Sequence, residues 1–244
     1  MADTKSPAKP RAKRALPHAD KPARTARAAQ AAPPPEAGEV APDKRSVKAM
    51  QILSAAAKIF NERGYHGTSV SDVAEALGVS KPFLYYYLKN KDDMLFECSR
   101  IATEQLHSML DEVRKADVSG WERLQLVFQG YARVMTTDFG ICLIRNTAPG
   151  SLPTDSREKL WVGRRRLNRE VEQIIARGIA DGSIRPCDPI ALTFAIFGAF
   201  NWITYWYREN GPLSPDEISV RFLDIFAHGA QANPDAATSQ ARRS

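Results

Sequence analysis

Hydrophobic positions recur at helical spacing between residues 64 and 91 more sharply than elsewhere in the chain. One predicted helix face gathers apolar residues at i, i+3, i+4 and i+7, namely Val70, Val73, Ala74 and Leu77. Leu84 and Leu88 lie four residues apart and direct a second helix back onto the first. The pattern therefore predicts two short packed helices, one on each side of Gly78.

Polar residues mark the ends of both helices. Ser69 can cap the first helix, with Asp72 three residues on in a variant of the capping box. Gly78 can close it, because glycine adopts the left-handed conformation without steric cost. Ser80 can cap the second helix, with Pro82 in its first turn. Two helices joined by such a tight turn form a helix-turn-helix, which presents its second helix to a DNA major groove.

The outer face of the second helix is basic and aromatic. Lysine ammonium groups and tyrosine hydroxyls donate to phosphates, and a tyrosine ring can lie on a thymine methyl. The alternative is that the tyrosines pack on neighbouring helices. The residues concerned are Lys81, Phe83, Tyr85, Tyr86, Tyr87, Lys89 and Lys91.

Residues 64–95, which begin GYHGTSVSDVAEALGVSKPFLYYYLKNK, resemble the DNA-binding domain of the tetracycline-repressor (TetR) family. The resemblance implies that the helix from Lys81 to Tyr87 enters the major groove. It implies phosphate contacts from Ser69, Lys81, Tyr85, Tyr87 and Lys91. It also implies that the residues nearest the bases are Ser71, Pro82, Phe83 and Tyr86. Phe83 stands where the family often has a small residue.

The rest of the chain also reads as helices, so we expect an all-α fold of about nine helices. A first helix should bury Val47, Met50, Leu53, Ala57 and Phe60. A fourth should begin at Asp92, and the last should bury Ile218, Phe222, Ile225 and Phe226. We predict a disordered tail over 1–42, a DNA-binding domain over 43–91, a ligand-binding and dimerisation domain over 92–230, and a second disordered tail over 231–244.

Charge is concentrated at the N-terminus of this 244-residue chain of net charge +6. Residues 1–30 contain eight Lys/Arg and two Asp/Glu, with almost no large apolar side chain. Such a segment cannot offset its ordering entropy, so it either attracts phosphates without sequence preference or is a solvated extension. Because it lacks an apolar stretch, we expect no signal peptide.

Cys98, Cys142 and Cys187 fit neither a disulfide framework nor a metal site, which favours a reducing cytoplasm and three small core residues. Residues 190–207 lack charge and reach the lower limit of a membrane span. Asn201, two threonines and several Trp/Tyr residues favour instead a helix buried on all sides of a helical protein. We therefore expect no membrane partner.

Two features of the C-terminal part are candidate ligand sites. The first is a set of bulky apolar residues with a few polar ones, which is typical of small-molecule pockets or of an ordinary core. It comprises Phe128, Tyr131, Met135, Leu143, Phe194, Phe197, Asn201 and Tyr205.

The second is Arg157 with Trp161 one turn later, followed by Arg164, Arg165 and Arg169 on the same predicted helix. Guanidinium groups bind phosphates and an indole offers a stacking face, which suits the nucleotide end of coenzyme A. The alternatives are a solvated basic face or a face toward a dimer partner.

No nucleophile–base pattern or metal spacing accompanies the four histidines, so we expect neither an enzyme nor a metal or other cofactor. The stretch GAFNWITYWYRENGPLSPDEIS resembles regulators of lipid, steroid or aromatic-acid catabolism that respond to acyl-CoA thioesters. We therefore expect a cytoplasmic homodimeric repressor of a palindromic DNA operator, released by an effector. Trp202, Phe222 and Phe226 would lie in the dimer interface. The alternatives are a lipophilic drug sensor that controls efflux and an architectural DNA-coating protein.

Overall fold

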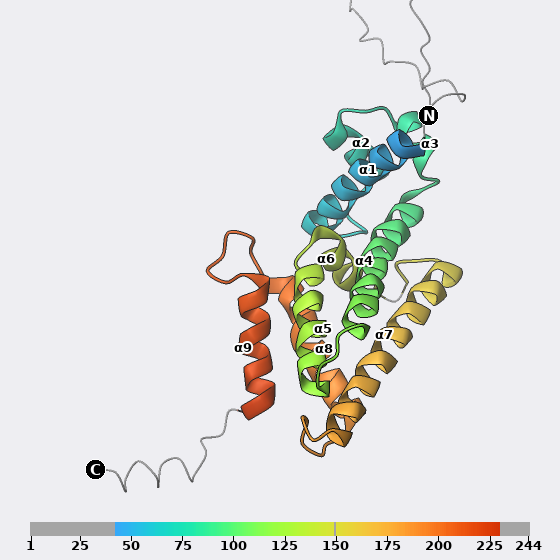
Figure 1. Ribbon diagram of the computed structural model, residues 1–244. Coiled ribbons are helices and arrows are strands. Elements are labelled where there is room, and N and C mark those ends of the chain that lie inside the picture. The colour runs from blue at the N-terminus through green and yellow to red at the C-terminus, as the bar shows by residue number, and fades with distance from the viewer. Residues whose placement is uncertain (1–41, 149, 230–244) are drawn as a thin grey trace, which may run out of the picture. The chain divides into compact units, whose positions relative to one another are not determined.

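The computed structural model describes residues 42–148 and 150–229, which contain helices and turns but no strand. Most of both predicted tails lies outside these residues. The prediction of an all-α fold of about nine helices is confirmed within the described ranges (Figure 1). The helices are α1 (Pro42–Arg63), α2 (Val70–Leu77), α3 (Lys81–Tyr87), α4 (Lys91–Arg114), α5 (Gly120–Met135), α6 (Asp138–Arg145), α7 (Thr154–Ala180), α8 (Pro189–Trp206) and α9 (Pro215–His228).

The predicted caps define α2 and α3. The Ser69 backbone N–H donates to Asp72 Oδ2 at 2.6 Å, and the Asp72 N–H donates to Ser69 Oγ at 3.3 Å, which completes the capping box. Gly78 adopts φ 63°, the left-handed conformation that ends α2. Ser80 Oγ accepts from the Phe83 N–H at 3.4 Å and caps α3. The helix-turn-helix is therefore set by short-range signals.

The fourth helix begins one residue earlier than expected. Asn90 is its N-cap and accepts the Asp93 N–H at 2.8 Å, so α4 starts at Lys91 instead of Asp92. The reason is that an asparagine oxygen caps as well as an aspartate oxygen does.

One hydrophobic cluster holds the DNA-binding helices together but does not end with them. Phe60 of α1 and Leu84 of α3 are completely buried in it. The cluster continues into the first half of α4 and into distant segments, through Met94, Leu95, Cys98, Ile101, Cys142, Leu152 and Leu160. The core of the DNA-binding unit therefore depends on residues far beyond the predicted boundary at residue 91.

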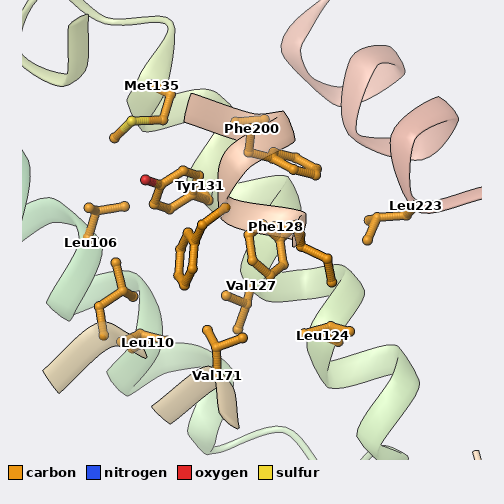
Figure 2. Packing of buried hydrophobic residues seen from close by; sticks show 14 of the residues in the cluster. Leu106, Leu110, Leu124, Val127, Phe128, Tyr131, Met135, Val171, Phe200 and Leu223 are labelled. Atoms are coloured by element: carbon orange, nitrogen blue, oxygen red, sulfur yellow. The ribbon is translucent and has the colours of Figure 1, made fainter. Parts of the chain in front are cut away.

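A second cluster fills the C-terminal half around α5. Phe128 lies completely buried at its centre, with ring centroids 5.2 Å from Phe197 and 4.8 Å from Phe200. Figure 2 shows Phe128, Tyr131 and Phe200 gathered between the helices, with Val171 and Leu223 approaching from other helices. Helix α4 contributes to both clusters and so connects them.

Gly163 allows α7 to lie close against α4. A Cβ at this position would meet Thr103 Cγ2 at 2.7 Å, a distance that would force a shift. His107 Nε2 lies 3.3 Å from the Gly163 carbonyl oxygen, one turn further along α4. The close approach of these two helices forms one wall of the pocket described below.

Three apolar residues predicted to be buried are exposed: Val47 by 53%, Met50 by 47% and Ile225 by 55%. The buried set of α1 begins only at Ile52, because the first turns of α1 extend beyond that cluster. On α9 the buried positions are Ile218, Ser219 and Leu223, which turns Ile225 outward.

The prediction that residues 190–207 are buried on all sides is wrong. One face of α8 packs inward through Ile196, Phe200 and Ile203, while Phe194 and Trp202 are 59% and 61% exposed. Within the described ranges, α8 and every other helix fall short of the length and apolarity that a bilayer crossing requires. Among the cysteines, Cys98 and Cys142 are buried and Cys187 is half-buried.

Candidate functional site

The exposed part of α3 forms the candidate DNA-binding surface. Lys81 and Pro82, in the first turn, are exposed, and Tyr85 is 50% exposed. Tyr86 is half-buried and its ring meets that of Tyr87 edge to face at 5.0 Å. Lysine and tyrosine donors therefore stand together on one short helix, in the part that a helix-turn-helix presents to DNA.

Phe83 and Tyr87 divide their surface between this face and the core. Both rings are half-buried against the first hydrophobic cluster, with centroids 5.3 Å apart. Lys48 Nζ of α1 lies 5.9 Å from the centre of the Phe83 ring. The half-buried packing of Phe83 fixes the ring in place, and its contact with a base stays a prediction.

Lys91 ties the start of α4 to the loop before α2. Its ammonium donates to the carbonyl oxygens of Tyr65 and Thr68, each at 3.1 Å, and lies 4.2 Å from the centre of the Tyr65 ring. An ammonium has three N–H donors, so one remains for a phosphate. Ser69 is exposed and Ser71 half-buried at the start of α2. The phosphate roles of Lys91 and Ser69 stay predictions.

A cavity of about 270 Å³ lies among α4, α5, α6, α7 and α8. Apolar side chains form most of its wall, and the Tyr131 hydroxyl donates to Asn201 Oδ1 at 2.6 Å inside it. Burial raises the pKa of Tyr131, so this hydroxyl stays protonated. Its lining includes Leu143, Trp161, Arg164, Phe194, Phe197 and Asn201.

A second cavity, of about 310 Å³, adjoins the first and is basic. Its wall consists of Thr147, Arg157, Glu158, Trp161, Arg164 and Arg165. The two cavities share Trp161, Arg164 and Arg165. Glu158 pairs with Arg165 at 2.6 Å, which leaves two guanidinium charges of this wall without a carboxylate partner among the described residues. We call this second cavity the basic mouth and the first the apolar chamber.

Arg164 lies where the chamber meets the basic mouth. Its Nη2 donates to the Leu143 carbonyl oxygen at 3.0 Å and to Thr147 Oγ1 at 2.8 Å. Burial lowers the pKa of this guanidinium, although the Tyr131 hydroxyl opposes that effect. A partly buried cation with only neutral partners in the described chain is suited to an anionic ligand.

Most of the predicted ligand-binding residues line one of these two cavities. Six of the predicted residues line the chamber: Tyr131, Leu143, Trp161, Phe194, Phe197 and Asn201. Arg157 lines the basic mouth. Phe128 and Met135 are completely buried and line neither cavity, so they support the chamber from behind. Tyr205 lies outside, stacked on Trp202 at 4.7 Å.

Other lining residues were not recognised as members of the pocket. Thr103, Leu106 and His107 of α4 line the chamber, as does Asn168 of α7. Arg164 and Arg165, which belong to the second predicted ligand site, line both cavities. A signal for Asn168 was present, since Arg157, Trp161, Arg164 and Asn168 follow a spacing of four, three and four residues along one helix face. No comparable signal marks the residues of α4, whose role depends on how α4 packs against α7.

The helix-turn-helix and the separate pocket define a DNA-binding protein with a site for a small molecule. Residues 52–98 match the family of bacterial regulatory proteins called the tetR family. Residues 117–230 match the tetracyclin repressor-like C-terminal domain. The chain belongs to the TetR family and is a transcriptional regulator, as the resemblance of residues 64–95 predicted.

Several known proteins are similar over most of their length. The HTH-type transcriptional repressor KstR2 of Mycolicibacterium smegmatis is 27% identical over 205 residues, covering 78% of this chain and 95% of the relative. The fatty acid metabolism regulator protein of Bacillus subtilis is 25% identical, covering 75% and 95%. The crystal structure of AibR in complex with isovaleryl coenzyme A and operator DNA has a TM-score of 0.66 at 24% identity, covering 73% and 97%.

Proposed function

We propose that the chain is a homodimeric repressor that an acyl-CoA thioester releases from a palindromic operator. The observation that carries this proposal is the shared wall between the apolar chamber and the basic mouth. An acyl group would occupy the chamber, while the nucleotide end of coenzyme A would lie in the mouth. Arg157 would bind a phosphate there and Trp161 would stack on the adenine.

The chemistry of the walls favours this ligand class over lipophilic cations. A buried cation needs a carboxylate partner, whereas Glu158, which lines the mouth, already pairs with Arg165. The chamber is also small enough to select among acyl groups by size. An architectural DNA-coating protein would need neither cavity.

The relatives support the same reading. AibR was crystallised with a coenzyme A thioester and operator DNA, KstR2 is a repressor, and the Bacillus subtilis relative regulates fatty acid metabolism. The two adjoining cavities support a thioester as the effector of this chain as well.

Dimerisation would use the exposed apolar face of α8 and α9. Large apolar side chains gathered on a monomer surface mark an interface. The most exposed apolar side chains of these two helices are Ile190, Phe194, Trp202, Val220 and Ile225, of which Phe194 also lines the chamber. Phe222 and Phe226, predicted in the interface, are half-buried against the second cluster and would contribute only their edges. A two-fold dimer presents its two recognition helices to a palindrome.

The experiment is an operator-binding titration, with an operator selected from random DNA duplexes. Acyl-CoA thioesters should release the protein, whereas the corresponding free acids and lipophilic cations should not. Arg157→Met should keep DNA binding and raise the thioester concentration needed for release by roughly ten- to a hundred-fold, as expected for about 1.5–3 kcal/mol lost with a charged hydrogen bond. Trp161→Leu should act in the same direction through lost stacking.

Arg169→Met is the matched control, because it removes the same charge from the same helix while lining neither the chamber nor the mouth. It should respond like the wild type. Release by free acids or cations at the concentrations needed for thioesters would contradict the coenzyme A proposal. A wild-type response from both Arg157→Met and Trp161→Leu would contradict it equally.

A further inference from the structure

A run of hydrogen bonds connects the effector cavities to the DNA-binding helices by way of α6. It begins at Arg164, whose Nη2 holds the Leu143 carbonyl oxygen and Thr147 Oγ1. Leu143 lies in the last turn of α6, and Thr147 follows its C-cap. The guanidinium that faces both cavities is therefore attached directly to the C-terminal end of α6.

Asn146, the C-cap of α6, carries the connection onward. Its side chain is 5% exposed and uses both ends of the amide. Oδ1 accepts the Tyr65 backbone N–H at 3.1 Å, and Nδ2 donates to Asn61 Oδ1 at 3.1 Å. Asn61 in turn donates from Nδ2 to the carbonyl oxygen of Asp138, the first residue of α6, at 2.9 Å. The end of α1 is thus held at both ends of α6.

The same connection reaches the start of α2. Tyr65 and Thr68, whose carbonyl oxygens both bind Lys91, form the loop that leads to the N-cap Ser69. A movement of the C-terminal end of α6 would therefore change the position of α1 and of the loop that orients α2 and α3.

We infer that Arg164 is the residue through which an anionic group of the effector acts on α6, and that Asn146 transmits this action to α1 and to the loop before α2. This inference rests on the proposed function for its ligand, but its hydrogen bonds are a property of the chain itself. The connection runs through α6, beside the apolar packing of α4 in both hydrophobic clusters.

The physical reason lies in the partners of Arg164. Its hydrogen bonds in the described chain are to neutral oxygens, whereas a charge-assisted bond to a phosphate or carboxylate is roughly twice as strong. An anion in the basic mouth would bind the three N–H groups of Nε and Nη1 that these oxygens leave free, and it therefore competes with Leu143 and Thr147 for the position of the guanidinium. The effector can shift the equilibrium between two positions of α6 only as far as it binds them differently, and this competition supplies such a difference.

A double-mutant cycle without any effector provides the first test. Arg164→Met and Asn146→Leu should each weaken operator binding by about three- to ten-fold, the range for the loss of one or two net hydrogen bonds. Because both residues act in one connection, the double variant should bind no more weakly than the weaker single variant. Losses that multiply in the double variant would overturn the inference.

The second test adds isovaleryl- and octanoyl-coenzyme A. Operator affinity is measured with and without each thioester, and thioester binding is measured through tryptophan fluorescence, since Trp161 lines both cavities. Asn146→Leu should bind the thioester within about twofold of wild type, yet the ratio of the two operator affinities should approach one. A wild-type ratio in this variant would overturn the inference.

Thr137→Ala is the control for a merely structural role. Thr137 caps the other end of α6 by accepting the Gly140 N–H at 3.1 Å and takes no part in the connection. It should lower the thermal midpoint while leaving the affinity ratio unchanged. Asn61→Ala replaces Asn146→Leu should that variant fail to fold, with the same expected results.

The two proposals fail in different ways. A wild-type protein that ignores all thioesters contradicts the acyl-CoA function, while the effector-free cycle still decides whether Arg164 and Asn146 act together. If thioesters release the wild type but the affinity losses of Arg164→Met and Asn146→Leu multiply in the double variant, only the connection through α6 is contradicted.

Discussion

The described chain exposes two contrasting surfaces, one on α3 and one on α8 and α9. The first presents the ammonium group of Lys81 and the phenol ring of Tyr85, both of which are exposed. The second presents the large apolar side chains of Trp202, Val220 and Ile225. Lysine and tyrosine donors suit an anionic polymer, whereas exposed apolar side chains gain free energy when another surface covers them. This contrast supports the proposal that DNA binds the first surface and that a second copy of the chain covers the other.

The two regions also differ in how they are built. The helix-turn-helix owes its form to caps that lie within three residues of their partners, such as Ser69 with Asp72. The effector pocket owes its form to contacts between distant helices, such as α4 with α7 at Gly163. Their cores are distinct clusters that α4 connects, so a mutation in one core should affect one function first.

The largest expected effect tests that separation. Leu84→Ala removes a completely buried side chain beneath α3 and should cost about 2–5 kcal/mol in the free energy of unfolding. Operator binding should fall far more than thioester binding, because the loss is in the core beneath the recognition helix. Leu124→Ala, at an equally buried position of α5, is the matched variant and should weaken thioester binding first.

Both affinities and the thermal midpoint are measured for each variant. Equal losses of both functions in both variants would show that the two clusters unfold as one unit. The comparison between the two regions would then hold for their surfaces only.

The DNA-binding unit could be predicted almost residue by residue, because its determinants are local. Caps, the left-handed Gly78 and the apolar spacing of α2 are all readable within ten residues. The extent of its core could not be predicted, since Cys142 and Leu160 join it through tertiary packing. The exposure of Val47 could not be predicted for the same reason. Hydrophobic periodicity identifies the apolar face of α1 but does not show where the helices that cover this face end.

The apolar and basic character of the pocket could be predicted from the sequence, but the full set of residues that line it could not. Arg157 and Trp161 carried a readable signal because they lie on one helix face. Phe128 and Met135 were equally plausible by residue type, yet they lie behind the wall. His107 carried no signal, because its place in the wall results from the close crossing at Gly163. Sequence spacing fixes neighbours on one helix and leaves the neighbours on other helices undetermined.

The second prediction concerns the apolar surface. Trp202→Glu should dissociate the dimer, with a loss of about 2–4 kcal/mol in its free energy, as for a central aromatic residue of an interface. Operator binding should weaken when the dimer dissociates, because two linked recognition helices bind a palindrome more tightly than one. Val162→Glu is the control, since Val162 is 55% exposed on α7, outside the proposed interface. Sedimentation measures the mass of each variant. If the Trp202→Glu variant stays dimeric, the apolar side chains of α8 and α9 do not form the interface.

The smallest expected effects distinguish two lysines of the DNA-binding surface, Lys81 and Lys91. If both contact phosphates, Lys81→Ala and Lys91→Ala should each weaken binding to all sequences and reduce the salt slope by about one. Lys81 is exposed and forms no hydrogen bond with the described residues through its side chain, so its loss should leave stability unchanged. Lys91 holds two carbonyl oxygens, so its loss should also cost about 1–3 kcal/mol of unfolding free energy.

Anisotropy titrations between roughly 50 and 200 mM salt give the slopes, and denaturant unfolding gives the stabilities. Lys115→Ala is the control for general charge, because Lys115 is an exposed lysine at the C-terminal end of α4, outside the DNA-binding surface. A Lys91→Ala variant that loses stability while keeping the wild-type salt slope would show that Lys91 only fastens the loop to α4. Lys81 would then be the lysine that meets the phosphate, and the DNA-binding surface would be confined to α3 and the start of α2.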